Sequence, residues 1–449
     1  MADFTPHTDA QIASMLAFCG LGSTDELFAA VPAAIRLAGG ALPLPSGLSE
    51  PDTLAVMDDL AARNRVGRDL VCFAGSGAYD HDVPAVVRRV AFRGEYVTAY
   101  TPYQPEVAQG VLQALFEYQT LITRLAGLPV ANASLYDGAS ATVEAVNLAV
   151  ATTGCPTVLL SEGVSPRYRQ VLATLAAGTG HALAPVGVAP DGRTAWATVP
   201  AGDAGAVVVQ HPNHLGVIED LRAARTAADA HGALLVVVAD PVALGLLRSP
   251  GGQGADVVVG EGQPFGTPLS FGGPYLGLFA CRQEHVRRLP GRLVGETVDN
   301  RGTTSYVTTL RTREQDIRRE RASSNVCTNQ TLIAVCCAIQ LGWLGASGLW
   351  ELALRCARGT RYAREAILQL EGVTPLVTGP TLREFAVRTP LPAVAVVERM
   401  AEEGYLAGVA VEEGNMTGAD GHALVIAVTE RRTRDEIDGY VAAFEKVIR

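Results

Sequence analysis

Four polar side chains lie close together just before a predicted helix, and they are the groups best placed to meet a substrate. They are Tyr100, Tyr103, Gln104 and Glu106. Their hydroxyl, amide and carboxylate groups could orient a small polar molecule or help to exclude water from it. Pro102 and Pro105 would also shape an ordinary turn. The residue types alone therefore favour a turn over a catalytic loop.

A second group of small polar residues stands before a long predicted helix. Residues 323–328 read SSNVCT, in which Ser324, Asn325 and Thr328 offer three short hydrogen-bonding side chains. Ser and Asn commonly cap the start of a helix. A helix start and a ligand contact are compatible with each other, so both interpretations stay open.

The remaining candidate groups predict no metal site. His211 and His214 flank a Pro–Asn pair without a nearby Cys, Asp or Glu triad, so a loop after a strand is the better interpretation. Asp80 and His81 resemble a catalytic pair, but a structural turn is favoured. The 8 cysteines contain no CxxC pair, so we expect buried thiols rather than metal ligands.

Lysine is almost absent from the chain. The 36 basic residues include one lysine, Lys446, close to the carboxyl end. No chemistry that needs an amine inside the fold is therefore available.

Composition indicates a large folded protein. A chain of 449 residues predicts two or three compact units. Hydrophobic residues make up 48% and charged residues 18%, which supplies a large core and argues against disorder. The net charge of −10 argues against nucleic acid or an anionic membrane as the main partner. No signal peptide is evident, and apolar runs such as 234–239 are too short to span a membrane. We expect a cytoplasmic protein.

Three regions follow from the hydrophobic pattern: a helical arm over residues 1–70, a large α/β domain over 71–325, and a connecting helix with a small α+β domain over 326–449. In the large domain, near-continuous apolar strands alternate with helices, which predicts a mostly parallel sheet covered on both faces. The candidate strands are 70–73, 130–133, 157–160, 206–210, 234–239, 257–259 and 276–280. The candidate helices include 105–126, 138–152, 165–176 and 221–230. The small domain is predicted as strand 384–388, helix 392–402, strands 406–411 and 423–428, and helix 434–447.

Five segments carry a resemblance to a known family. They are residues 73–81 (FAGSGAYDH), 100–110 (YTPYQPEVAQG), 128–138 (LPVANASLYDG), 254–266 (GADVVVGEGQPFG) and 311–328 (RTREQDIRRERASSNVCT). In this order they resemble the P-protein of the glycine cleavage system, a glycine decarboxylase. Motifs of this length are far more specific than a short glycine fingerprint. The resemblance covers essentially the whole chain. The length matches the N-terminal of two similar halves, which some members carry as a separate subunit 1. Asp316 and Ser323 depart from the more usual His and Thr.

The resemblance implies the architecture of fold-type I pyridoxal-phosphate enzymes: an arm, a mostly parallel seven-stranded sheet and a small α+β domain. Those enzymes bind the cofactor through a lysine amine. Here Gln263 falls near the lysine position, and an amide nitrogen cannot form an imine. Asp137 would place a carboxylate, as a helix cap, where the phosphate would bind. Asp240 follows a strand, like the aspartate that pairs the pyridine nitrogen in active members. We expect pyridoxal phosphate on a partner subunit and none bound covalently to this chain.

The resemblance also implies an activity and partners. With subunit 2, in two copies of each subunit, the enzyme would decarboxylate glycine and transfer the aminomethyl group to the lipoyl arm of H-protein. The loop at 100–106 would reach into the partner's active site, and Ser324, Asn325 and Thr328 would help to complete its phosphate site. This chain would be inactive alone.

Three alternatives stay open at this point. An independent fold-type I decarboxylase is opposed by the missing lysine. A non-catalytic paralogue could act as a scaffold or regulator. A dinucleotide-binding protein would need a full glycine fingerprint after its first strand, of which Gly75 and Gly77 form only a fragment.

Overall fold

The computed structural model describes residues 6–37, 44–65, 69–97, 100–270, 272–411 and 420–449. The chain divides into two compact units, Met1–Arg65 and Val66–Arg449. In the first unit, helices α1 (Asp9–Phe18) and α2 (Glu50–Ala62) begin at Thr8 and Ser49, whose hydroxyls accept backbone hydrogen bonds and so act as N-caps. Short 3-10 turns lie at Thr24–Phe28 and Ala33–Ile35. No described residue of these helices is buried within the unit.

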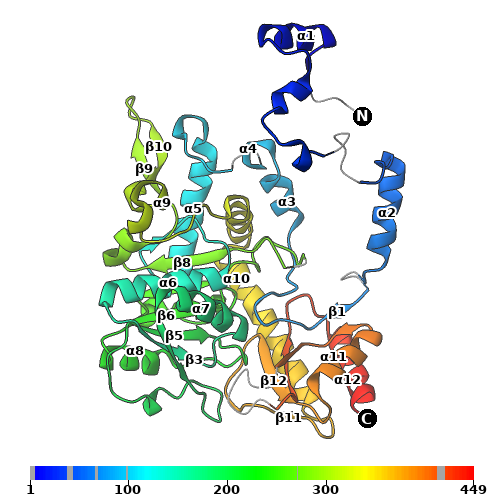
Figure 1. The fold of residues 1–449 in the computed structure, drawn as a ribbon. Helices are drawn as coiled ribbons and strands as arrows, with labels where there is room; N and C mark the ends of the chain where they lie inside the picture. Colours follow the sequence, from blue (N-terminus) through cyan, green and yellow to red (C-terminus); the bar gives the residue numbers. More distant parts are fainter. Residues whose placement is uncertain (1–5, 38–43, 66–68, 98–99, 271, 412–419) are drawn as a thin grey trace. The chain divides into compact units, whose positions relative to one another are not determined.

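The second unit is built on a seven-stranded sheet, several strands of which are labelled on the left of Figure 1. Its strands, in spatial order, are β2 (Val130–Ala131), β8 (Gly277–Cys281), β7 (Val257–Glu261), β6 (Leu234–Ala239), β5 (Ala206–His211), β3 (Thr157–Ser161) and β4 (Ala182–Val186). Only β8 runs against its neighbours, so the predicted, mostly parallel sheet is confirmed.

Successive residues of the central strands pack into two different hydrophobic cores. Leu159, Val207 and Val237 face one core with helices α5 (Gln109–Ala126) and α8 (Leu221–Ala230). Their neighbours Val158, Val208 and Val236 face the other, with α6 (Gly138–Thr153) and α7 (Pro166–Thr179). Burial on both faces explains why these strands read as continuous apolar runs.

The small domain has a four-stranded antiparallel sheet in the order β11 (Thr374–Pro375), β12 (Glu384–Arg388), β15 (Ala423–Ala427) and β14 (Val409–Val411). Helices α11 (Ala393–Glu402) and α12 (Arg434–Ile448) pack on it. The segment β1 (Val71–Cys72) belongs here, because it pairs with β13 (Tyr405–Leu406) and the next residue, Phe73, stacks on Tyr440 with ring centroids 4.0 Å apart. The candidate strand at 70–73 is therefore not part of the large sheet.

A long helix, α10 (Thr331–Ile367), joins the two domains. Its length and composition alone would let it cross a membrane. The backbone leaves the helical conformation at Gly345, and apolar side chains on both sides of this kink pack in the large core, while those of the last turns pack in the small domain. We therefore assign α10 to the interior of the fold.

The structure corrects one helix and adds strands. The helix predicted from Pro105 is a 3-10 turn, Pro105–Val107, then a break at Ala108, and α5 begins only at Gln109. Val107, predicted inside that helix, is 79% exposed. Strand β4 and the hairpin of β9 (Leu293–Val298) and β10 (Thr304–Thr309) were not predicted. The other short helices are α3 (Ala85–Ala91), α4 (Gly94–Val97) and α9 (Gln315–Arg318), with 3-10 turns at Trp196–Thr198, Ala243–Gly245, Gly251–Gln253, Gln283–Arg288, Arg311–Arg313 and Arg319–Arg321.

Candidate functional site

Gln263 lies on the turn after β7 and is fully buried. Its side-chain oxygen accepts a hydrogen bond from the Tyr79 N–H at 2.9 Å. Its side-chain nitrogen donates to the carbonyl oxygens of Tyr79 and Thr267, at 3.0 and 2.8 Å. The amide thus both accepts and donates, and it ties this turn to the segment around Tyr79. A lysine ammonium group could donate in this place but could not accept.

Glu261 is the last residue of β7, and its carboxylate lies at the N-terminus of α6. Its carboxylate accepts hydrogen bonds from the backbone N–H groups of Gly138, Gln263 and Leu276, each at 2.9 Å. Gly138 is the first residue of α6, and a helix N-terminus favours an anion. Burial raises the pKa of Glu261 to about 7, although the three N–H donors act in the opposite direction. Asp137 accepts from the Ser140 N–H at 2.7 Å, which confirms the predicted N-cap.

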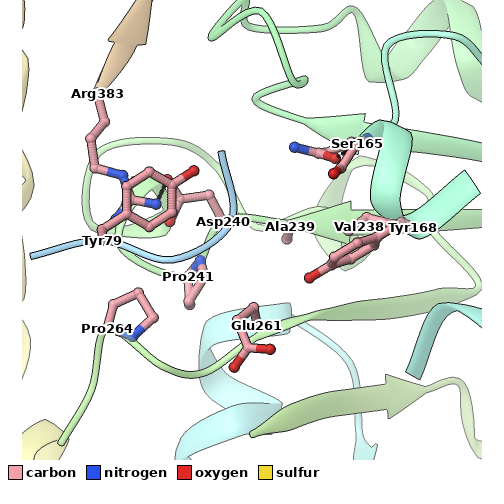
Figure 2. Close-up of a pocket in the computed structure, with 12 residues that line it drawn as sticks. Tyr79, Ser165, Tyr168, Val238, Ala239, Asp240, Pro241, Glu261, Pro264 and Arg383 are labelled. Carbon is pink, nitrogen blue, oxygen red and sulfur yellow. Dashed lines mark hydrogen bonds and ion pairs between the residues drawn. The ribbon is translucent and has the colours of Figure 1, made fainter. Parts of the chain in front are cut away.

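Asp240 is largely buried and forms an ion pair with the buried Arg383 of the small domain. The carboxylate and guanidinium lie 2.7 Å apart, and the guanidinium carbon lies 3.4 Å from the centre of the Tyr79 ring. Figure 2 shows Arg383 beside the Tyr79 ring and reaching toward Asp240. The Tyr79 hydroxyl donates to Glu384 at 2.8 Å. The aspartate is thus paired with a cation from the same chain.

A cavity of about 40 Å³ lies among these groups, lined by Tyr79, Tyr168, Asp240, Glu261 and Arg383 together with their neighbours. The Tyr168 hydroxyl fills the place where a side chain on Gly138 would lie. A space of this size holds a few water molecules. It is far smaller than the roughly 300–1,000 Å³ of typical small-molecule sites.

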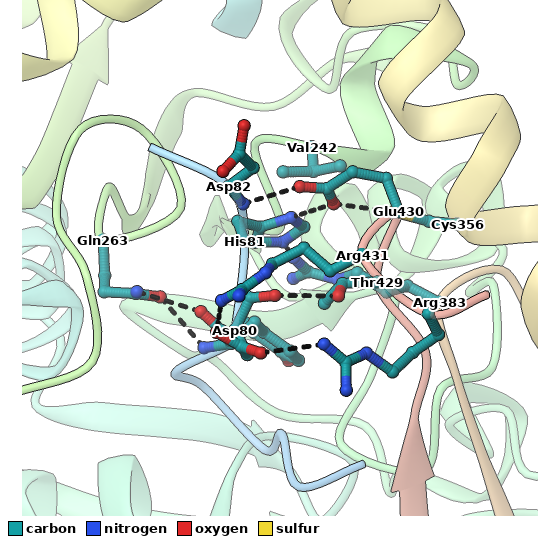
Figure 3. Close-up of polar contacts among 12 residues, drawn as sticks. Asp80, His81, Asp82, Val242, Gln263, Cys356, Arg383, Thr429, Glu430 and Arg431 are labelled. Carbon is teal, nitrogen blue, oxygen red and sulfur yellow. Dashed lines mark hydrogen bonds and ion pairs between the residues drawn. The ribbon is translucent and has the colours of Figure 1, made fainter. Parts of the chain in front are cut away.

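His81 and Glu430 connect this region to the loop after β15 (Figure 3). His81 Nδ1 lies 2.6 Å from a Glu430 oxygen, and Arg383 Nη1 lies 2.5 Å from His81 Nε2. The Cys356 sulfur is 3.7 Å from the same carboxylate. In the described part of the chain, one group of side chains is spaced to ligate a metal ion, and it consists of His81, Cys356 and Glu430. Each already has a hydrogen-bonding partner, and the neighbouring Arg383 cation opposes a second cation. Asp80 joins the same structural turn through Thr429, Arg431 and Arg432.

We expect Glu261 to make stability depend on pH. Its pKa is 4.5 ordinarily and about 7 when folded, so the folded state holds a proton that the unfolded state releases. The resulting stabilisation is present below about pH 4.5 and is lost as the pH rises through about 7, at most about 3 kcal/mol.

The measurement compares the wild type with Glu261→Gln by urea unfolding across this pH range. Burial lowers the pKa of His211 and His214 to about 4, and this acts in the opposite direction. The informative quantity is therefore the wild-type stability minus that of the variant, which should shrink as the pH rises. Parallel pH curves for the two proteins would remove Glu261 from the explanation.

The predicted loop residues lie at the surface and do not line the cavity. The Tyr103 ring sits 5.0 and 4.8 Å from the guanidiniums of Arg292 and Arg311, and its hydroxyl accepts a hydrogen bond from Arg292. Tyr100 is 74% exposed, and Gln104 and Glu106 are exposed. The loop is held in place while its polar ends remain open to a partner.

The second predicted cluster lies next to that loop. The hydroxyls of Thr101 and Thr328 are 3.3 Å apart. The Ser324 hydroxyl accepts from the Val326 N–H at 3.1 Å, and Asn325 is exposed. The structure thus brings the loop at 100–106 and the segment 324–328 onto one surface. Their contributions to catalysis stay predictions.

Sequence reasoning missed Glu261, Arg383 and Tyr79. A signal was present for two of them. Glu261 follows a fully apolar strand, and Arg383–Glu384 opens another, so both places required buried charges to find partners. Sequence alone could not show which partners these would be.

Comparisons with known proteins agree over the whole chain. The family model described as glycine cleavage system P-protein matches residues 2–444. The chain is 46% identical over 447 residues to "Probable glycine dehydrogenase (decarboxylating) subunit 1" of Moorella thermoacetica, covering 99% of both proteins. It is also 46% identical, over 98% of both, to the protein of that name from Prosthecochloris aestuarii.

Solved structures give the same assignment. A crystal structure of glycine decarboxylase (P-protein) of the glycine cleavage system, in inhibitor-bound form, superposes with a TM-score of 0.91 at 43% identity, over 99% of this chain and 100% of that one. Mouse CSAD, at 16% identity over 91% and 90% of the two chains with a TM-score of 0.65, shares the fold. The architecture is that of fold-type I pyridoxal-phosphate enzymes, and the chain belongs to the glycine cleavage system P-protein family.

Proposed function

We propose that this chain is the subunit of glycine decarboxylase that does not bind pyridoxal phosphate. With a cofactor-bearing subunit 2, two copies of each, it decarboxylates glycine and transfers the aminomethyl group to the lipoyl arm of H-protein in the cytoplasm. Its similarity to proteins named subunit 1 supports a partner subunit. The finer assignment, that the partner carries the cofactor, rests on the buried site around Gln263.

The residues present do not fit the cofactor. An amide stands where the amine would be needed, and it makes three hydrogen bonds of its own. The Glu261 carboxylate takes the N–H of Gly138 that a phosphate would otherwise use. A cavity of about 40 Å³ cannot take a phosphorylated ring. The small size of this cavity, into which the neighbouring side chains leave little room for a ligand, is the observation that carries the proposal.

This chain would contribute a surface to the partner's active site. The end of the loop at 100–106 is held by hydrogen bonds, because Gln109 Nε2 donates to the carbonyl oxygens of Pro105 and Tyr306, at 2.8 and 2.9 Å. A loop that is held firmly can orient glycine or exclude water without a loss of entropy on binding. Pyridoxal phosphate on the partner supplies the electron withdrawal that decarboxylation needs.

The test is reconstitution with the partner subunit. The isolated chain should remain colourless with pyridoxal phosphate and should not exchange the glycine carboxyl group with bicarbonate. The co-purified pair should do so. A stable pair that lacks this exchange, although the partner holds its cofactor, would favour a scaffold or regulator instead.

Glu106→Gln and Tyr103→Phe should slow glycine–bicarbonate exchange by the reconstituted pair by roughly tenfold or more, as expected when a hydrogen bond that positions a substrate is lost. The complex should stay intact in gel filtration. Glu117→Gln, which changes an exposed glutamate of α5, serves as the matched control. Normal rates for both loop variants would rule out the role proposed for this loop.

A further inference from the structure

A second, larger cavity lies away from the site described above. It holds about 450 Å³ between α6, the 3-10 turn Gln283–Arg288, and residues 310–323. Five arginines line it: Arg287, Arg288, Arg313, Arg318 and Arg321. Among the described residues that line it none is acidic. This concentration of positive charge contrasts with the net charge of −10 for the whole chain.

Internal contacts fix two of the arginines in place. Arg313 donates to the carbonyl oxygens of Leu289 and Gly291, the latter at 2.7 Å, and Arg318 Nε donates to Thr312 O at 3.1 Å. These hydrogen-bonding partners are neutral carbonyl groups, which do not neutralise the positive charges. Two carboxylates lie near these arginines in the described part of the chain: Glu320 lies 3.9 Å from Arg321, with both side chains exposed, and Glu314 interacts electrostatically with Arg313.

Like charges held close together repel one another, and a bound anion relieves that repulsion. Guanidinium forks match phosphate oxygens two at a time. The remaining walls supply polar groups on Asn147, Thr312 and Ser323 and apolar surface on Leu148, Ala151 and Leu310. The volume falls within the range of small-molecule sites. A concave cavity of this size fits a compact ligand better than an extended acidic peptide.

We propose that this cavity binds a phosphate-bearing small molecule with two or more negative charges. The proposal does not depend on the function assigned to Ser324, Asn325 and Thr328, which do not line the cavity. The ligand's source is either an inorganic polyphosphate or an organic phosphate ester. An organic ester would also contact Leu148, Ala151 and Leu310.

The test measures binding of inorganic pyrophosphate and of ATP without magnesium, by calorimetry, to the full chain and to its complex with the partner subunit. Saturable binding with one site per chain is expected for at least one probe. Tighter binding of ATP indicates an organic ester, and equal or tighter binding of pyrophosphate indicates an inorganic source. The double variant Arg287→Gln/Arg318→Gln should weaken binding by roughly tenfold or more, because it removes two charge-assisted contacts.

Arg222→Gln, which changes an exposed arginine of α8, is the control and should bind like the wild type. Each probe that binds should raise the melting temperatures of the wild type and of the control more than that of the double variant. Without ligand, all three proteins should melt at similar temperatures. The proposal is overturned if neither probe binds the wild type, if the double variant binds equally well, or if binding disappears in the complex.

Discussion

Arg383→Met is expected to lower the free energy of unfolding by about 3–5 kcal/mol, because it leaves the largely buried Asp240 carboxylate without its cation. Arg383 is 3% exposed and lies 2.7 Å from Asp240. The same guanidinium contacts His81 and the Tyr79 ring. Methionine keeps much of the side-chain volume, so the loss reports chiefly on charge and hydrogen bonds.

A matched control lies nearby in the chain. Arg388 is the last residue of β12, whereas Arg383 directly precedes this strand, and Arg388 is paired with Asp420 with both side chains about half exposed. Arg388→Met should therefore cost less than about 1 kcal/mol. Both variants are compared with the wild type by urea unfolding at neutral pH.

A double variant separates the ion pair from other effects. Asp240→Asn in the Arg383→Met background should recover part of the lost stability, since the uncompensated carboxylate is then gone. If Arg383→Met keeps wild-type stability and instead alters glycine dependence in the reconstituted pair, Arg383 binds a ligand and is not a structural cation.

The sequence was sufficient for most of the framework. Strand β6 and helix α8 have the predicted bounds, because an apolar run of strand length and an Asp220 cap leave little ambiguity. The segment at 70–73 also has the apolar pattern of a strand. It pairs instead with β13 of the small domain, which lies more than 300 residues away in the chain. The sequence could not predict this pairing, because local patterns carry no information on contacts between distant segments.

The start of α5 shows a different limit. Pro105 is a suitable first residue for a helix, and it does begin a helical turn. The chain then breaks at Ala108, where Gln109 bonds to Pro105 O and to both backbone groups of Tyr306 in β10. A contact with a hairpin almost 200 residues away thus overrides the local preference. The predicted loop is longer and more exposed for the same reason.

The site was predictable in part. The missing lysine was visible in the sequence, and so was the Asp137 cap. The way in which the fold uses the remaining space was not, because it depends on three-dimensional neighbours. Glu261 accepts a hydrogen bond from the N-terminus of α6, Arg383 forms an ion pair with Asp240, and Gln263 accepts one from the Tyr79 N–H. These polar groups bind one another, which makes their contacts a source of stability.

Restoring the amine alone should therefore fail to restore a cofactor site. Gln263→Lys is expected to lower the free energy of unfolding by about 2–4 kcal/mol, because the Tyr79 N–H loses its acceptor and a charge is buried. Gln263→Met, which loses the same hydrogen bonds without adding charge, should cost less. The comparison isolates the effect of the ammonium group.

The same Gln263→Lys protein is then incubated with pyridoxal phosphate, treated with borohydride and mapped by peptide mass. Lys446 is an internal reference, because it is exposed and paired with Glu403 at 2.7 Å. Labelling at residue 263 should not exceed labelling at Lys446, since Glu261 still accepts the Gly138 N–H and Tyr168 still crowds the start of α6. Preferential labelling at residue 263 would mean that the absence of a lysine at this position is the only obstacle to cofactor binding. The filled cavity would then be a consequence of the missing lysine and not an independent barrier.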